Sequence, residues 1–186
     1  MNPVYAAALE LQAFCRGQGW RFCFIGGIAV QRWGEPRLTV DADLTLLTGF
    51  GGEERYVDAL LGTFRPRNAG AREFALERRV LLLEAANSIS LDVSLGAIPF
   101  EERVVQRSSS FPIHEGESLV TCCAEDLVVL KAVAGRDQDW ADIRGIVARQ
   151  AGRLDVELVE REALPLLELK EDPAATGRLR RMLREG

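Results

Sequence analysis

Residues 37–47 and 88–95 each alternate between apolar and polar side chains, and this pattern constrains the fold more than any other feature of the sequence. A period of two residues is typical of a β-strand with one buried face and one exposed face. In the second stretch four apolar residues share one face, and Asp92 lies on the other. The first stretch carries Asp41 and Asp43, whose side chains project from the same face with Cα atoms about 7 Å apart. The sequence therefore predicts a sheet with acidic side chains on its polar face.

The other segments predict helices around this sheet and a helical end to the chain. Apolar residues at helical spacing indicate helices, and β-branched runs indicate strands. We expect a mixed α/β (α+β) fold, with a core over 1–122 and a helical part over 123–186 packed on it. We expect helices over 3–15, 28–33, 53–61, 125–134, 139–150, 156–169 and from about 174, strands over 21–25, 37–47, 79–84 and 88–95, and irregular or weakly β structure over 103–121 with a turn at Gly116.

Composition restricts the chemistry that such a fold can carry. The 186 residues, 47% of them hydrophobic, suffice for one globular domain with a helical annex. No apolar run approaches the roughly 18 to 20 residues that span a bilayer, so we expect a cytoplasmic protein without a membrane partner. The four cysteines form no CxxC pair, and His114 is the only histidine. Carboxylates must therefore carry any metal-binding or acid–base chemistry.

The charge balance argues against broad nucleic-acid binding, which needs many lysine and arginine contacts to phosphate. The formal net charge is −5 and the isoelectric point is near 5.1. A local basic patch can still form near the end of the chain, where it could meet a polyanion or form a solvated face that balances nearby acids. The basic residues are Arg178, Arg180, Arg181 and Arg184, and the nearby acids are Glu168, Glu171 and Asp172.

The three strand acids predict a site for divalent cations. If the strand with Asp92 neighbours the strand with Asp41 and Asp43, three carboxylates share a small volume and repel one another. A cation relieves this repulsion, and ligation by oxygen alone favours Mg²⁺, with Mn²⁺ as a substitute. An Asp-x-Asp pair on its own also occurs in loops and helix caps, where it has a structural role.

Gly26 and Gly27 stand between an expected strand and a short expected helix. Glycine lets backbone N–H groups approach an anion, and a helix N-terminus favours negative charge. These residues therefore predict a phosphate cradle. Many strand-to-helix turns also use glycine for purely structural reasons. The acidic pair that begins 14 residues after Gly27 favours the functional interpretation.

Together these motifs resemble the pattern of the polymerase-β-type nucleotidyltransferase superfamily, and most closely that of AbiEii-like toxin enzymes. The resemblance implies a nucleotidyltransferase-type mixed sheet flanked by helices, with a nucleotidyltransferase core over 1–122. It also implies that Gly26 and Gly27 hold the phosphates of an NTP, that Asp41 and Asp43 bind two Mg²⁺ ions, and that Asp92 completes the site. Glycine stands here where many relatives have serine, which removes a hydroxyl contact to phosphate. The matching segments are Phe24-Ile25-Gly26-Gly27-Ile28-Ala29, Arg37, Thr39, Asp41-Ala42-Asp43-Leu44 and Asp92.

The resemblance continues in the segments 125–131 and 135–143. Lys131 shares a helix face with apolar neighbours, so its ammonium either extends to a cleft and contacts the triphosphate or reaches bulk solvent. Asp139 and Asp142 lie at a helix start, where acids interact well with the helix dipole, and we favour a structural role for both. Arg37 either clamps phosphate or pairs with Glu35.

These features predict an enzyme that transfers NMP from an NTP such as ATP to an acceptor hydroxyl and releases pyrophosphate. The toxin-like resemblance implies RNA, a tRNA 3′ end or a protein as acceptor, with a cognate antitoxin as partner. The alternatives are an antibiotic-type transferase that modifies small molecules, a non-catalytic NTP-binding module, and a phosphohydrolase that uses the same metals.

Overall fold

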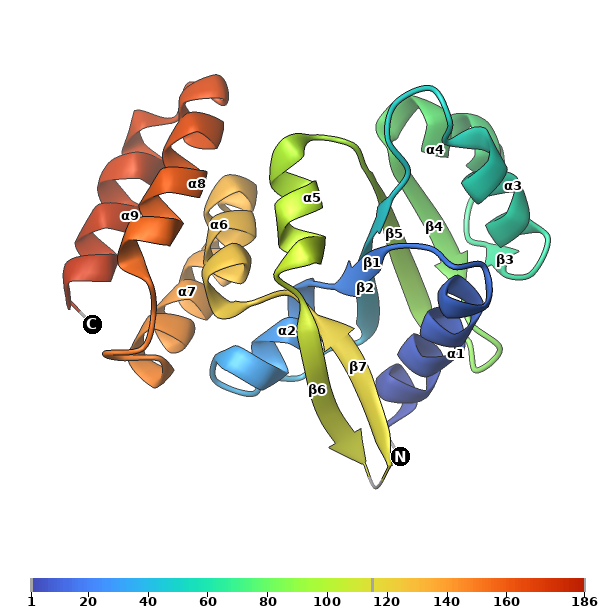
Figure 1. Ribbon diagram of the computed structural model, residues 1–186, viewed down its shortest axis with the longest axis horizontal. Coiled ribbons are helices and arrows are strands. Elements are labelled where there is room, and N and C mark those ends of the chain that lie inside the picture. The colour runs from blue at the N-terminus through green and yellow to red at the C-terminus, as the bar shows by residue number, and fades with distance from the viewer. Residues whose placement is uncertain (1, 115, 186) are drawn as a thin grey trace. The chain divides into compact units, whose positions relative to one another are not determined.

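Seven strands form one mixed sheet in the computed structural model, which describes residues 2–114 and 116–185 (Figure 1). The strand order is β3-β4-β5-β2-β1-β7-β6. β2 pairs in parallel with β5 and antiparallel with β1, so the sheet is mixed as the sequence predicts. The strands are β1 Phe22–Phe24, β2 Asp41–Leu47, β3 Arg65–Pro66, β4 Val80–Glu84, β5 Ser90–Gly96, β6 Ser109–His114 and β7 Glu117–Thr121.

Along the sequence, the helices up to Gln106 precede or separate strands, and from Ala124 onward helices follow one another to the end of the described chain (Figure 1). They are α1 Pro3–Gly17, α2 Gly26–Trp33, α3 Glu54–Leu61, α4 Ala71–Arg78, α5 Pro99–Gln106, α6 Ala124–Ala134, α7 Asp137–Arg149, α8 Val156–Leu169 and α9 Pro173–Glu185. The observed architecture thus confirms an α/β fold with a helical C-terminal part.

The chain divides into two compact units. The sheet unit consists of Leu38–Thr121 together with the chain up to Ile28, and the helical unit consists of Ala29–Arg37 together with the chain from Cys122 onward. The segment Ala29–Arg37, which the sequence analysis placed in the core, is held in the helical unit by hydrogen bonds. The Trp33 indole N–H donates to the Cys122 carbonyl at 2.8 Å, and the Gln150 amide donates to the Trp33 carbonyl at 2.9 Å.

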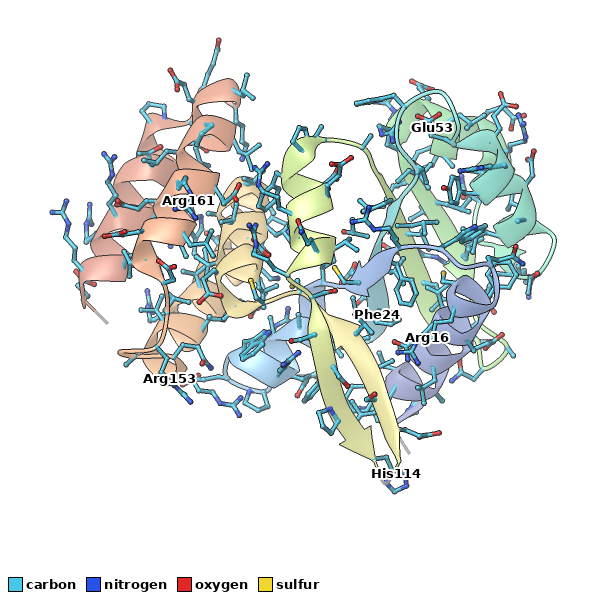
Figure 2. The ribbon with its side chains drawn as sticks, in the orientation of Figure 1. Arg16, Phe24, Glu53, His114, Arg153 and Arg161 are labelled. Atoms are coloured by element: carbon cyan, nitrogen blue, oxygen red, sulfur yellow. The ribbon has the colours of Figure 1, made fainter. Side chains whose placement is uncertain are left out.

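The sheet unit buries the apolar faces of β2 and β5 against its helices. Leu44, Leu91 and Val93 are fully buried. The acids on the opposite face, Asp41, Asp43 and Asp92, are half-buried. The alternation in the sequence therefore predicted correctly which face of each strand enters the core. α1 contacts β2 and β7, and the ring of Phe24 in β1, labelled in Figure 2, is buried in this core.

The structure corrects the sequence analysis in three regions. β2 begins at Asp41, so residues 37–40 are not a strand. Residues 99–106 form a helix that the sequence did not predict, whereas β6 and β7 pair as a hairpin, in agreement with the weakly β structure and the turn expected at Gly116. α5 starts at Pro99, where the Glu101 carboxylate accepts hydrogen bonds from the N–H groups of Ala97 and Ile98 at 2.7 and 3.0 Å. α4 and β3 were also missed.

None of the described helices combines the length and the apolar character that crossing a bilayer requires.

Candidate functional site

The turn from β1 into α2 places a glycine directly against an acidic side chain. The Ile25 N–H donates to the Asp43 carbonyl at 3.0 Å, which ties the turn to β2. Gly26 follows with φ +55, a left-handed conformation that favours glycine. A Cβ atom on Gly26 would lie 1.9 Å from Oδ2 of Asp43. Glycine at position 26 therefore allows both the backbone conformation and the close approach of the carboxylate.

Gly27 is constrained by a different neighbour. A Cβ atom on this residue would lie 2.1 Å from Oγ1 of Thr39, whose side chain is buried. The same hydroxyl donates to Oδ1 of Asp41 at 3.2 Å. The Thr39 hydroxyl thus occupies the space that a side chain at position 27 would fill, and it contacts one of the two acids of β2. This contact explains why glycine stands at position 27.

Asp41, Asp43 and Asp92 project from the same face of the β2–β5 pair. The parallel register makes Asp43 and Asp92 direct Cα partners, and Asp41 lies two residues earlier in β2. All three are half-buried, whereas the residues between them are buried. The sequence had placed Asp92 on the polar face of its strand, and the strand pairing brings it beside the Asp-x-Asp pair.

Asp92 pairs with Arg67, a residue that the sequence analysis missed. Arg67 follows β3, and its backbone N–H donates to the Leu82 carbonyl at 3.0 Å. Its guanidinium forms an ion pair with the Asp92 carboxylate. Burial raises the pKa of the Asp92 carboxyl above its ordinary value, Arg67 opposes this shift, and the negative charge of Asp41 adds to it. Arg67 is thus a cation beside the acidic face, and no local motif in the sequence indicated it.

The donor chemistry of this face fits Mg²⁺ or Mn²⁺, because every candidate ligand is a carboxylate oxygen. As the side chains are placed, no three aspartate, glutamate, histidine or cysteine residues within the described chain converge closely enough to hold a metal ion. The Asp92 carboxylate faces Arg67 instead. A common ligand set therefore requires Asp92 to exchange its contact with Arg67 for a metal ion.

Lys131 lies in the helical unit and forms ion pairs with two aspartates of α7. Its Nζ is 2.9 Å from Oδ1 of Asp139 and 2.8 Å from Oδ2 of Asp142. The lysine is 5% exposed, so neither the extension to a cleft nor the solvent-exposed position expected from the sequence is observed. Arg37 donates from Nε and Nη2 to the two oxygens of Asp142 at 2.8 and 2.9 Å, a partner that the sequence analysis did not consider.

The pKa values of the two α7 carboxyls are lowered by these donors. Burial raises the pKa of Asp142, but hydrogen bonds from Arg37, Lys131 and Gln138 outweigh it and bring the value to about 2. Burial acts in the same direction on Asp139, where hydrogen bonds from Arg136 and Lys131 lower the pKa. Both carboxylates are therefore charged and compensated inside the helical unit, as expected for structural residues.

The sequence-predicted site residues thus fall into two groups. Gly26, Gly27, Thr39, Asp41, Asp43 and Asp92 gather at one face of the sheet unit, and Arg37, Lys131, Asp139 and Asp142 form an ion-pair network in the helical unit.

The chain is similar to known proteins in structure but not in sequence. No family model matches the chain, and no curated protein matches it in sequence. The solution structure of the antibiotic-resistance factor ANT(2'')-Ia is similar with a TM-score of 0.57 and 15% identity, over 95% of this chain and 98% of that one. The fold is similar to nucleotidyltransferase folds. An antigenic nucleotidyltransferase-like protein from Paracoccidioides brasiliensis aligns at a TM-score of 0.49 and 13% identity, over 95% of this chain and 91% of its own.

Proposed function

We propose that this chain is a metal-dependent nucleotidyltransferase that moves NMP from an NTP to an acceptor hydroxyl and releases pyrophosphate. The observation that carries the proposal is the clustering of Asp41, Asp43 and Asp92 on one sheet face beside the Gly26 turn. The likeness in fold to nucleotidyltransferases agrees with it. Carboxylates on a half-buried sheet face, next to the start of a helix, suit a reaction in which metal ions and phosphates meet.

We assign Asp41 and Asp43 as the principal metal ligands and Asp92 as the residue that completes the ligand set and accepts the proton of the attacking hydroxyl. Mg²⁺ ions, when bound, supply the Lewis acidity that activates the hydroxyl and stabilises the leaving oxygens. The N–H groups at the start of α2, around Gly26 and Gly27, are assigned to the NTP phosphates.

Thr39 positions Asp41 in this scheme, because its hydroxyl donates to the Asp41 carboxylate at 3.2 Å. Lys131 and Arg37, which the family resemblance assigned to phosphate, are engaged by Asp139 and Asp142. We therefore assign this lysine and arginine to the stability of the helical unit rather than to the NTP.

The acceptor that we propose is an RNA hydroxyl, for which a tRNA 3′ end is the test substrate. A protein hydroxyl and a cognate antitoxin belong to the same toxin-like hypothesis. A second candidate is transfer to a small molecule, favoured by the structural likeness to an antibiotic-resistance factor. Incubation with labelled ATP and Mg²⁺, in parallel with tRNA and with an aminoglycoside, distinguishes the two acceptors by the product that carries the label.

The proposal is tested by following pyrophosphate release and label transfer from α-labelled NTPs with Mg²⁺. We expect transfer by the wild type and loss of transfer in Asp41→Ala and Asp43→Ala. Asp137→Ala, which removes an exposed aspartate at the start of α7, is the matched control and should retain full activity. Equal activity in all four proteins would remove Asp41 and Asp43 from the mechanism.

Two other outcomes identify the alternatives named from the sequence. Nucleotide binding by calorimetry without pyrophosphate release identifies a non-catalytic NTP-binding module. Phosphate release without any acceptor identifies a phosphohydrolase.

A further inference from the structure

A groove between α7 and α9 of the helical unit gathers arginines from both helices. Its volume is about 610 Å³. Arg144 and the aliphatic side chains of Val147 and Ala148 come from α7. Arg178, Arg181, Met182 and Glu185 come from α9. The groove therefore combines a basic rim with an apolar floor, and Glu185 is its only acidic lining residue among those the structure describes.

The arginines of this groove are free of the ion pairs that engage other arginines. In the sheet unit Arg65, Arg72 and Arg79 each pair with a glutamate or an aspartate. Arg144 and Arg181 are exposed, and neither has a carboxylate within ion-pair distance in the part of the chain that the structure describes. The acids at 168, 171 and 172, which the sequence offered as balancing charges, form no ion pair with them.

A third arginine of the groove is held in place by an aromatic ring. The Arg178 guanidinium lies 4.6 Å from the centre of the Trp140 ring, which is buried. Stacking on an aromatic face keeps the charge of an arginine and leaves its N–H groups available to an anion. The groove thus presents three guanidinium groups that still have unused donors.

These features fit a linear polyanion. α9 carries four arginines against one glutamate, although the whole chain has a net charge of −5. Of these four arginines, Arg178 and Arg181 line the groove, and their Cα atoms are about 4.5 Å apart along the helix axis. We propose that the α7–α9 groove binds the phosphodiester backbone of a single-stranded nucleic acid. Phosphates contact the arginines, and sugars or bases lie on the aliphatic floor.

An anionic membrane is the competing polyanion, and the structure of α9 disfavours it. Helices that bind at a membrane surface insert large apolar side chains into the lipid. The large apolar residues Leu179 and Leu183 of α9 are buried within the protein. Only charged residues, small residues and the half-buried Met182 are left for contact from this helix.

Binding at the groove requires no nucleotide transfer, so it can be measured separately from the proposed function. If the bound strand is the acceptor of nucleotide transfer, that role of the groove rests on the proposed function. The experiment uses the full chain with Asp41→Ala, without any NTP, and follows the anisotropy of a fluorescein-labelled 20-nucleotide RNA and of the matching DNA at several salt concentrations. In this way a failure of transfer and a failure of binding give different results.

We expect Arg144→Glu with Arg181→Glu to weaken binding of both probes by about tenfold or more, because two phosphate contacts become repulsive. The milder Arg144→Ala with Arg181→Ala should reduce the slope of log K against log salt by about 1.4, that is, about 0.7 for each lost contact to a single strand. The alanine pair also serves if the glutamate pair does not fold.

The matched control reverses two exposed arginines that do not line the groove, Arg16 of α1 and Arg161 of α8, both labelled in Figure 2. It changes the net charge equally and should weaken binding much less. The proposal is overturned by equal binding in all variants, by equal weakening in the control, by absence of binding in the wild type, or by binding to phosphatidylserine vesicles without binding to RNA or DNA.

Discussion

Asp142 in the helical unit receives hydrogen bonds from Arg37, Lys131 and Gln138, whereas Asp92 in the sheet unit faces Arg67 and the negative charge of Asp41. The pKa of Asp142 is lowered and that of Asp92 is raised, although burial acts in the same direction on both. The difference therefore comes from their neighbours: three donors surround Asp142, whereas Asp92 has one arginine and a second acid beside it.

This contrast separates carboxylates that stabilise the protein from carboxylates that are available to a ligand. A buried acid with several internal donors gains nothing from a metal ion, because its charge is already compensated. An acid beside another acid, with a single arginine nearby, remains under-compensated and attracts a cation.

The largest effect is expected for Asp41→Asn. We expect nucleotide transfer to fall on the order of a thousandfold, because a neutral amide is a poor ligand for Mg²⁺. The free energy of unfolding should change by less than about 0.5 kcal/mol, since this side chain is half-exposed. Activity assays and urea unfolding measure the two quantities. A large loss of stability would place Asp41 with the structural acids.

Lys131→Ala should have the opposite effect on the two measurements. It leaves Asp139 and Asp142 buried with one donor fewer each, and such a loss costs about 3 to 5 kcal/mol. Lys170→Ala is the control. Lys170 is exposed, donates to the Val133 carbonyl at 2.8 Å and lies 3.7 Å from Asp172, and such exposed contacts contribute about 0 to 1 kcal/mol. Chemical denaturation gives both values. If Lys131→Ala remains fully stable but loses affinity for NTP, its assignment returns to phosphate binding.

Acid should weaken the helical unit through Asp142. Its pKa of about 2 lies below the ordinary value of 3.8, so the stabilisation is complete above pH 3.8 and is lost as the pH falls toward 2. The lost contribution is about 2 kcal/mol. Urea unfolding of the wild type and of Asp142→Asn between pH 7 and pH 2 measures it. The two curves should converge at the acid end, and a constant difference would exclude ionisation as the cause.

Gly27→Ala tests the contact that organises Asp41. A Cβ atom would meet the Thr39 hydroxyl at 2.1 Å, so this substitution should destabilise the protein by about 1 to 3 kcal/mol. Thr39→Ala removes the obstacle, and the double variant should recover part of that loss. Gly17→Ala is the control, because nothing lies within 4 Å of its Cβ position. Strictly additive effects of the two substitutions would show that the contact does not determine the choice of glycine.

The smallest effect is expected for Arg67→Gln. In the proposed metal site Arg67 would compete with cations for Asp92, so its removal should strengthen Mn²⁺ binding by about two- to fivefold, in line with the strength of a partly exposed ion pair. Arg72→Gln is the control, since Arg72 pairs with Glu54 and Asp58. Calorimetric titration with Mn²⁺ measures both variants. Weaker Mn²⁺ binding in Arg67→Gln would show that Arg67 supports the site instead of competing with cations.

Local patterns predicted the elements that depend on near neighbours in sequence. The two-residue period of 88–95 indicated which side of β5 is buried, and the glycines at 26 and 27 indicated a turn into a helix. The alternation over β6 and β7 indicated only weakly β structure, and β3, α4 and α5 were missed because each is too short to show a clear apolar period. These failures concern short elements whose stability comes from packing.

Periodicity along the chain was enough to place three acids on polar faces of strands and to predict a helical C-terminal part, because side-chain direction follows from backbone periodicity. The neighbours of these acids depend on how the chain packs. Packing placed Asp92 beside Asp43, gave Lys131 two buried partners, and brought the Thr39 hydroxyl onto Gly27. Such contacts join residues that are distant in the chain, and the charge of each site depends on them.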